Sequence, residues 1–528
     1  MHEWAAVVDG ALATVAGIHY NLFLGSLVDD DQSPSRDLTP YTRLERTGTF
    51  LCTERAHGND AAALQTTADY DRATGGFVLH TPNEGAEKFM PNTGPAGGPK
   101  SAVVAARLLV DGRDLGVFLF LTPLTDRDGV PLPGIRVREL PERIGSPVDH
   151  CVTTFDRVRL DRGALVQGPH GRLRADGSLE SSVGSPRKRF LAAIGRVTVG
   201  KLCMSASTLG GSRAALAIAV RYAHTRHISG PTAGHRVPLA AHRSHHARLL
   251  KALATAYAMT FLHRAVTERW ITHAPDERAE VERLVAIAKG WITWRAREIT
   301  LESRERCGAR AMFPVNGLAE YPANADGAIT AEGDNLAIWC KAGAEMIFGY
   351  TPAVPTPRPP ADAGVPAGGV ASLTEPGFLR DLIAAAERGW HERARRELRS
   401  GPPGEPLGRW NGASGPALEL VTAHATLQAA DAFIATLDSV THSPTRAVLG
   451  ELCALFLLEA VAPRTGELLA DGLMSAEQVR ALPDTVERLT AALAPHLTVL
   501  AEACDVPEEH LSGLPLLSVP DPVTRRTG

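Results

Sequence analysis

The chain holds 528 residues with a formal net charge of −4, a hydrophobic fraction of 44% and a charged fraction of 22%. These values are typical of a globular chain with several domains, and they exclude a disordered protein or a strongly basic nucleic-acid-binding protein. No apolar run reaches the ~20 residues that a membrane helix needs, and the start MHEWAAVVDG lacks the features of a signal peptide. The seven cysteines stand singly, without a CxxC pair, so we expect reduced thiols and a cytoplasmic location.

The first half of the chain changes from helical to β-rich texture. An apolar segment, 11–28, predicts a small helical start within residues 1–46. Short β-rich runs then alternate with Gly, Pro and Asp turns, which predicts an all-β domain over 47–170. The runs are 76–80, 102–110, 117–121 and 151–160.

The second half is helical in pattern. Apolar residues at i, i+3 and i+4 spacing predict long helices over 190–222, 237–270 and 280–307, within a helical-bundle domain at 185–350. A Pro/Ala/Gly-rich stretch, 351–375, predicts a linker. A further helical domain follows at 376–512, and 513–528 is expected to be a frayed tail. The fold class is therefore mainly α with a central β-barrel or β-sandwich domain and an extra C-terminal helical domain.

The first candidate site motif opens the β-rich region. Residues 52–60 read CTERAHGND, and 64–71 read LQTTADYD. The segment by itself could be a turn whose polar side chains satisfy local backbone groups. These residues resemble the TE-x-x-(H)G segment and its LeTTAtYD continuation in acyl-CoA oxidases and dehydrogenases. The resemblance implies that Thr53 bonds the flavin ring.

A second stretch of that region, 88–92, reads KFMPN and resembles the KWWPG stretch of the family. In the family the glycine backbone touches the flavin, and Asn92 stands in its place here. Asn tolerates unusual φ better than most residues, so we expect a weakened backbone contact at Asn92.

Two arginines in the helical region are candidates for the cofactor. Residues 221–226, RYAHTR, resemble the family's RYA-x-x-R, whose arginine engages the FAD pyrophosphate across a dimer interface. This implies a homodimer with Arg226 on the pyrophosphate, since a guanidinium suits paired phosphate oxygens. The alternative is an exposed surface arginine. The family's LATAYA helix recurs at 253–258, and Arg243 lies in the preceding run 242–246, HRSHH, which replaces YQTQQ on the adenosine side of the cofactor.

Three histidines of that run, His242, His245 and His246, could share a helical face in the manner of a metal site. No carboxylate lies at matching spacing, so we favour a polar helix face and predict no metal site.

The catalytic assignment rests on 329–336, which reads ITAEGDNL. It resembles the oxidase EGDN motif, whose glutamate is the catalytic base. The resemblance implies that Glu332 removes the α-proton of a thioester, with the β-hydrogen passing to the flavin, and that Asp334 and Asn335 contact the cofactor. The alternative is a surface glutamate that caps a helix.

A turn before that motif, 307–312, reads CGARAM and resembles the family's CGGxGY, so Gly308 is a further cofactor-contact candidate. Alanines at 309 and 311 replace the other glycines and are expected to crowd the turn. The resemblance extends over 17–511. It implies that much of the family's N-terminal helical domain is absent, through a late start, a true truncation or a partner that covers the gap.

The helical block at 376–512 resembles the oxidase C-terminal domain and so favours O2 as the electron acceptor. The leading hypothesis is a cytoplasmic bacterial FAD-dependent acyl-CoA oxidase that forms an enoyl thioester and H2O2. Two alternatives remain. One is a dehydrogenase of a specialised pathway that uses another acceptor or a carrier-protein thioester. The other is a flavin-free partner subunit. The acyl group stays open, as does the choice between CoA and a carrier protein.

Overall fold

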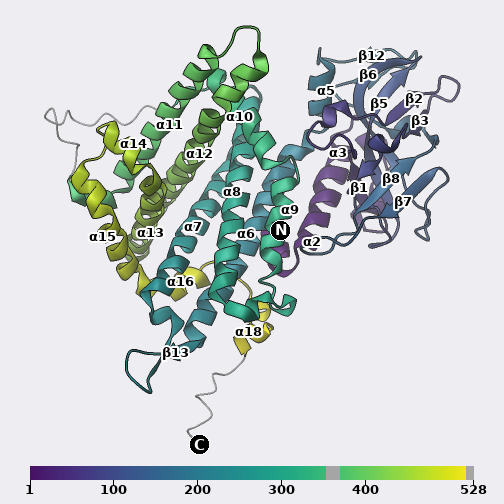
Figure 1. The fold of residues 1–528 in the computed structure, drawn as a ribbon. Helices are drawn as coiled ribbons and strands as arrows, with labels where there is room; N and C mark the ends of the chain where they lie inside the picture. The colour runs from purple at the N-terminus through teal and green to yellow at the C-terminus, as the bar shows by residue number, and fades with distance from the viewer. Residues whose placement is uncertain (353–368, 519–528) are drawn as a thin grey trace, which may run out of the picture. The chain divides into compact units, whose positions relative to one another are not determined.

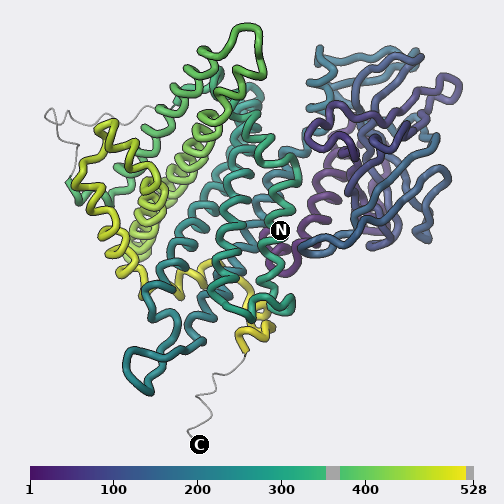
Figure 2. Tube along the Cα trace, viewed as in Figure 1, coloured from purple at the N-terminus to yellow at the C-terminus, as the bar shows by residue number. Residues whose placement is uncertain are grey.

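A computed structural model describes residues 1–352 and 369–518, and it confirms a mainly α fold with a central β-region (Figure 1). The chain divides into two compact units, and Figure 2 follows the Cα path of the described residues. The helical unit comprises Met1, Glu3–Val8 and Ser205–Gly528; the β unit comprises His2 and Asp9–Met204. The domain boundaries expected from sequence stay a prediction.

The β unit contains a seven-stranded sheet in the order β10-β6-β5-β2-β3-β9, with β1 pairing with β5. A three-stranded sheet, β4-β8-β7, accompanies it, and a short hairpin, β11-β12, follows later in the chain. The bounds of the strands are β1 Thr47–Leu51, β2 Thr67–Tyr70, β3 Phe77–His80, β4 Lys88–Phe89, β5 Lys100–Val110, β6 Arg113–Pro123, β7 Ile135–Glu139, β8 Cys151–Phe155, β9 Val158–Leu160, β10 Leu165–Val166, β11 Arg172–Leu173 and β12 Leu179–Glu180.

Strand β5 lies at the centre of the large sheet and separates two cores. Its neighbours are β1 and β2, both parallel, and β6, antiparallel. Side chains alternate between the faces of a strand, so Val104 and Ala106 lie in one core and Val103 and Ala105 in the other. A strand covered on both faces reads as a continuous apolar run, and this explains the sequence at 102–110.

The second of these cores is formed against the helical start of the β unit. Helix α2 (Gly10–Ala16) continues into a π-helix, η1 (Gly17–Leu24), and then into α3 (Gly25–Val28). Phe23 of η1 is fully buried and lies in that core. The His19 imidazole joins η1 to β1, because its Nδ1 accepts from the Gly48 N–H at 2.8 Å while its Nε2 lies 3.1 Å from the Tyr41 carbonyl.

Three predicted segments are each interrupted in the structure. The run 151–160 forms two strands, because Arg157 takes a left-handed φ of 51° between β8 and β9. The predicted helix 190–222 is two helices, α5 (Pro186–Ala193) and α6 (Arg196–Thr225). The predicted helix 237–270 begins only at Arg243, because Arg236–Pro238 (β14) pairs with His227–Ser229 (β13).

The helical unit is built around long helices that share one core. Aromatic contacts join Phe261 to Phe433 at 5.0 Å, Phe433 to Phe456 at 6.3 Å and Trp291 to Phe456 at 6.2 Å between ring centroids. The helices preceding and following residues 351–375 therefore pack together. Their bounds are α7 Arg243–Thr272, α8 Arg278–Arg306, α9 Glu320–Thr330, α10 Asn335–Gly349, α11 Pro376–Ser400, α12 Pro406–Ser439, α13 Ser443–Val461 and α15 Ala476–Leu493.

Parts of the predicted linker and tail are ordered. Residues 353–368 and 519–528 lie outside the described residues. Val370–Thr374 forms a 3-10 helix in which Ser372 accepts from Gln478 at 3.1 Å. The expectation of a frayed tail is wrong for Pro515–Ser518 (α18), because the Leu516 N–H donates to Asn316 at 2.9 Å and the Leu516 side chain is buried.

Among the described residues, one helical run, Gly10–Val28, is long and apolar enough to span a membrane. Two consecutive helices, Pro186–Ala193 and Arg196–Thr225, meet the same criterion only when they are taken together, and the chain bends by 45° between them. The run has 19 residues, just short of the ~20 that a membrane helix needs. About 61% of its most apolar window is buried, and the core helix of a soluble protein passes the same test.

Gly48 of β1 lies so close to η1 that a side chain at position 48 would displace Phe23 of η1. A Cβ on Gly48 would stand 2.0 Å from Phe23 Cδ1. We expect Gly48→Ala to lower the free energy of unfolding of the β unit by about 1–3 kcal/mol, as overpacking does. Urea denaturation measures this, with Gly184→Ala as the control because nothing lies within 4 Å of its Cβ position. Equal stability of the two variants would contradict the close contact.

Candidate active site

Glu332 lies in a short connection between helices α9 and α10, in a backbone conformation that glutamate rarely adopts. Its φ is 58°, and Gly333 follows at 95°. Left-handed backbone costs a side-chain-bearing residue roughly 1–2 kcal/mol, so it persists only where the surroundings fix it, most often at functional sites. Glu332 is partly buried. The geometry therefore marks Glu332 as a residue held in place at an energetic cost.

Asp334 begins helix α10 as its N-cap. Its carboxylate accepts from the Leu336 N–H at 3.0 Å and from the Ala337 N–H at 3.4 Å. The side chain therefore satisfies backbone donors that a helix start leaves open. The predicted contact of Asp334 with a cofactor stays a prediction, and the structure gives its side chain this capping role.

Asn335, the next residue, is 1% exposed and wholly engaged inside the helical unit. Its Oδ1 accepts from Lys289 at 2.8 Å, and its Nδ2 donates to Thr293 at 2.9 Å and to the Gly290 carbonyl at 3.3 Å. Both amide protons are thus used within the chain. The side chain therefore anchors the start of α10 to α8, and the cofactor contact predicted for Asn335 stays a prediction.

The turn after helix α8 needs one glycine only. Gly308 has φ 64°, whereas Ala309 and Ala311 lie in the 3-10 helix Gly308–Met312 without left-handed backbone. The backbone therefore needs no glycine at these two positions, and the crowding expected from the alanines stays a prediction. Met312 and Phe313 are exposed, at 66% and 61%.

The two predicted cofactor arginines differ in their surroundings. Arg226 follows α6 and is exposed, and no hydrogen bond or ion pair engages its guanidinium within residues 1–352 and 369–518. Arg243 begins α7, and its guanidinium donates to the Glu487 carbonyl of α15 at 2.8 Å. The first guanidinium is available to a ligand, whereas the second is already used in part to join two helices.

The histidines at the start of α7 form a polar cluster with unused nitrogen atoms. The Nε2 atoms of His242, His245 and His246 are buried without hydrogen-bond partners among the described residues. Burial, followed by the charge of Arg306 and the neighbouring imidazoles, lowers the pKa of His245 to about 4. Its imidazole is therefore neutral at physiological pH. No group of three or more metal-ligating side chains is arranged to hold an ion in the described part of the chain.

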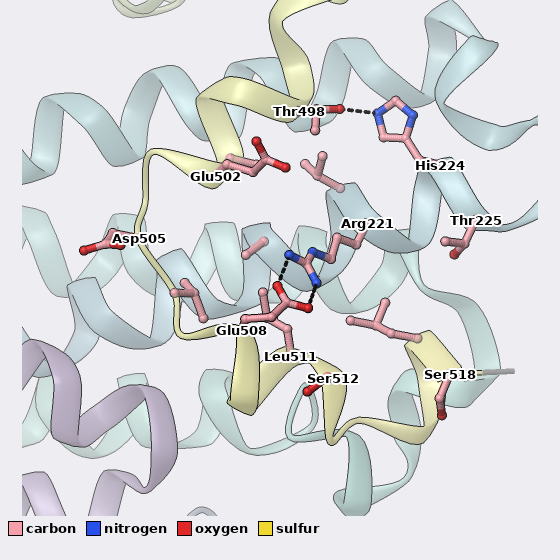
Figure 3. A pocket seen from close by; sticks show the side chains of 15 residues that line it. Arg221, His224, Thr225, Thr498, Glu502, Asp505, Glu508, Leu511, Ser512 and Ser518 are labelled. Atoms are coloured by element: carbon pink, nitrogen blue, oxygen red, sulfur yellow. Dashed lines mark hydrogen bonds and ion pairs between the residues drawn. The ribbon is translucent and has the colours of Figure 1, made fainter.

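A pocket of about 700 Å³ lies beside the C-terminal end of α6 (Figure 3). Arg221 points across it and donates to Glu508 at 2.8 Å, while His224 and Thr498 are joined at 3.0 Å. Further carboxylates, those of Glu502 and Asp505, line it. Because acidic side chains outnumber the one paired arginine, this pocket does not suit phosphate groups.

In the β unit, a buried ion pair joins the two motif segments. Lys88 Nζ lies 3.0 Å from Glu54 Oε1, and both side chains are fully buried. Lys88 also donates to the carbonyls of Cys52 at 3.3 Å and Ala105 at 2.7 Å. Burial opposes ionisation of Glu54, but Lys88 and the hydrogen bonds from Thr66 and Gln65 outweigh it and hold its pKa below the usual value.

The predicted residues of these segments, Thr53 and Asn92, are presented differently. Thr53 is exposed, and its carbonyl accepts from the Phe89 N–H at 3.0 Å. Asn92 is 1% exposed, and its carbonyl accepts from Lys100 at 2.8 Å. The left-handed residue of the stretch is Met90, with φ 64°, not Asn92. The reason expected from sequence for an asparagine at position 92 is therefore wrong, because its side chain serves as a buried acceptor for the Thr49 hydroxyl at 2.5 Å.

Sequence reasoning missed the buried lysines that hold these segments. Lys289 lies in AIAKGW, and its only signal is a charged residue on an otherwise apolar stretch of helix. The role of Lys88 was likewise not assigned, although the residue is part of a recognised stretch. Both lysines donate mainly to backbone carbonyls. Every residue has a backbone carbonyl, so the sequence does not indicate which of them a lysine binds.

Comparison with known proteins places these observations in a family. The family model described as "Acyl-CoA oxidase, C-alpha1 domain" matches residues 195–347, and the one described as "Acyl-CoA oxidase" matches 393–513. An acyl-coenzyme A oxidase-like protein of Mus musculus is 28% identical over 357 residues, covering 66% of this chain and 56% of that protein. Peroxisomal acyl-coenzyme A oxidase 2 of Arabidopsis thaliana is 30% identical over 362 residues, covering 66% and 52%.

The fold is also found among solved structures. Acyl-CoA oxidase-1 of Caenorhabditis elegans, complexed with FAD and ATP, matches with a TM-score of 0.82 and 22% identity, covering 95% of this chain and 78% of that one. At 22% identity this likeness shows the fold alone. The chain belongs to the acyl-CoA oxidase family. The chain spans about half the length of the relatives from Mus musculus and Arabidopsis thaliana.

Replacing Gly333 tests the backbone of the Glu332 connection. Gly333→Ala places a Cβ 2.8 Å from Ile338 Cγ2 at a φ of 95°. We expect a loss of about 1–2 kcal/mol in the free energy of unfolding of the helical unit, since left-handed backbone disfavours alanine. Denaturant unfolding measures this, and Gly349→Ala at the other end of α10, with open space around it, is the control. A variant as stable as the control would show that the connection is not fixed.

Removing one partner of the buried pair tests the β-unit segments. Lys88→Met leaves the Glu54 carboxylate buried without its cation, which typically costs about 3–5 kcal/mol. We expect this loss in the unfolding of the β unit, whereas Arg174→Met, which removes the exposed pair with Glu180, changes little. Chemical denaturation followed by circular dichroism measures both. Similar small effects in the two variants would show that the pair does not hold the segments.

Proposed function

We propose that this protein is an FAD-dependent acyl-CoA oxidase that desaturates an acyl thioester to the trans-2-enoyl thioester, with O2 accepting the electrons to give H2O2. Glu332 is the base that removes the α-proton.

The observation that carries the proposal is the strained backbone of Glu332. A surface glutamate that merely caps a helix has no need of left-handed backbone, and in this chain the capping role belongs to Asp334. Strain of this kind is retained where a side chain must point in a particular direction. The alternative interpretation of Glu332 as a helix cap therefore loses its support.

The chemistry requires a fixed carboxylate. The α-proton of a thioester is weakly acidic, so its removal needs a base placed within hydrogen-bond reach and kept from water. Glu332 is partly buried, and the glycine that follows it has a φ of 95°. FAD, when bound, supplies the acceptor for the two electrons that leave with the β-hydrogen.

Several groups of the chain suit FAD. Thr53 presents a hydroxyl at the surface of the β unit, and Arg226 presents a guanidinium without an internal partner among the described residues. The unsatisfied Nε2 atoms of the three histidines near Arg243 provide buried polar atoms that a ligand would satisfy. The related structure from Caenorhabditis elegans holds FAD. These observations support FAD as the cofactor, with the pyrophosphate at Arg226.

An exposed, unpartnered Arg226 also supports a homodimer. A guanidinium with no carboxylate of its own chain is suited to the diphosphate of a cofactor held by a second copy. We include a homodimer in the proposal on that ground.

The decisive experiment is the visible spectrum of the purified protein with and without substrate. We expect flavin absorption that bleaches without oxygen on addition of a suitable acyl-CoA, and H2O2 formation in air. Glu332→Gln should keep the flavin and lower the bleaching rate by about 10²- to 10⁴-fold, the usual contribution of a positioned base. The control is Glu345→Gln, a glutamate of α10 that pairs with Lys341 at the surface.

The outcomes separate the alternatives. A colourless protein that does not take up added FAD would exclude the oxidase and favour a flavin-free partner subunit. Bleaching without H2O2 in air would indicate a dehydrogenase with another acceptor. Bleaching at the normal rate in Glu332→Gln would show that another group is the base.

A further inference from the structure

Lys289 is a fully buried lysine in the middle of helix α8. Burial of an ammonium group is costly unless hydrogen bonds replace the lost water. Three acceptors in and beside the α9–α10 connection supply those bonds: the carbonyl of Ile329 at 3.0 Å, the carbonyl of Gly333 at 2.9 Å and Oδ1 of Asn335 at 2.8 Å. The acceptors are sufficient for all three protons of the ammonium group.

The two carbonyl groups lie on either side of Glu332. Ile329 is in the last turn of α9, where helix carbonyls lack partners, and Gly333 directly follows the left-handed glutamate. Lys289 therefore fixes the chain at both ends of residues 330–332. A backbone conformation that is unfavourable by itself persists when both of its ends are held.

The same stretch of α8 supports the connection in a second way. The Thr293 hydroxyl donates to the Lys289 carbonyl at 2.8 Å and accepts from Asn335 at 2.9 Å. Trp339 of α10 donates to the Ile287 carbonyl at 3.2 Å and lies against Gly290, where a Cβ would meet its Nε1 at 2.1 Å. About two turns of α8 thus hold the start of α10 and the segment that precedes it.

We propose that Lys289 is a positioning residue for the reaction: it holds the backbone of Glu332 so that the carboxylate points at the α-carbon of the thioester. This inference rests on the proposed function, since it concerns the base of that reaction. Lys289 acts through the carbonyl groups of the connection and needs no contact with substrate.

The test is Lys289→Met, which keeps the length of the side chain and removes all three donors. We expect the rate of flavin bleaching, measured per bound flavin in single turnovers, to fall about 10²-fold, the effect of a small misplacement of a reacting group. The dissociation constant of the acyl-CoA should be unchanged. The matched control is Lys341→Met, which removes a surface lysine of α10 paired with Glu345 at 2.6 Å and should bleach at the normal rate.

An isotope effect distinguishes positioning from a loss of folded protein. With α-deuterated acyl-CoA, misplacement of the base makes proton removal more rate-limiting, so the isotope effect should rise in Lys289→Met. A smaller fraction of active protein would lower the amplitude and leave the isotope effect at the wild-type value. Amide exchange of residues 329–335 in the substrate-free protein should also become faster in the variant.

A milder variant decides the matter if Lys289→Met does not fold. Thr293→Val removes the hydroxyl that accepts from Asn335 and keeps the shape of the side chain, and a smaller fall in bleaching rate with a raised isotope effect is expected. Normal bleaching and a normal isotope effect in whichever variant folds would overturn the role of Lys289. Normal bleaching in Glu332→Gln would contradict the proposed role of Glu332 as the base. Slow bleaching in Glu332→Gln together with normal bleaching in the Lys289 and Thr293 variants would support that base and contradict the positioning role of Lys289.

Discussion

The structure depends most on buried ammonium groups that donate to backbone carbonyls. Lys88, Lys100 and Lys289 are among the largest fully buried side chains of the described residues. Each donates to a carbonyl at or beside a predicted site residue: Lys88 to Cys52, before Thr53; Lys100 to Asn92 itself; and Lys289 to Gly333, after Glu332. The same physical device recurs in both units.

This device follows from what a binding segment needs. Residues that meet a cofactor or a substrate lie in connections, where neither a helix nor a sheet ladder satisfies the carbonyl groups. A single lysine offers three donors on a flexible stem and can satisfy several carbonyls at once. Its burial is costly, so the arrangement is retained only where an irregular backbone must be held in one conformation. Lys88 and Lys100 also pair with Glu54 and Asp149, which balances their charge.

How much the sequence reveals depends on the range of the interactions. The alternation of strands and turns and the long helices depend on local patterns, so the β-region and helix α8 were predictable. The late start of α7 was not, because Arg236–Pro238 is extended only through its pairing with His227–Ser229. The shared core of Phe261, Phe433 and Phe456 joins residues far apart in the chain, which an i, i+4 pattern within one helix does not reveal.

The candidate site shows the same division. The motif predicts the base at Glu332, and the structure gives that residue left-handed backbone. The side chains of Asn335 and Asn92, in contrast, are buried and bonded within the fold. A resemblance transfers the position of a residue more safely than its role, since buried and exposed polar residues look alike in a sequence. Arg226 and Thr53, by contrast, are exposed, as residues that meet a ligand must be.

The four residues EGDN are best understood as one backbone unit. Glu332 takes left-handed backbone, Gly333 extends it where a Cβ would collide with Ile338, Asp334 caps α10, and Asn335 fixes the helix to α8. Glycine, aspartate and asparagine in this motif thus serve the backbone conformation that holds the glutamate. A sequence that keeps all four keeps the means of holding the glutamate, and this is a stronger argument for its function than an overall identity of 30% or less. A flavin-free relative under no demand to place the carboxylate would have no reason to retain the strain.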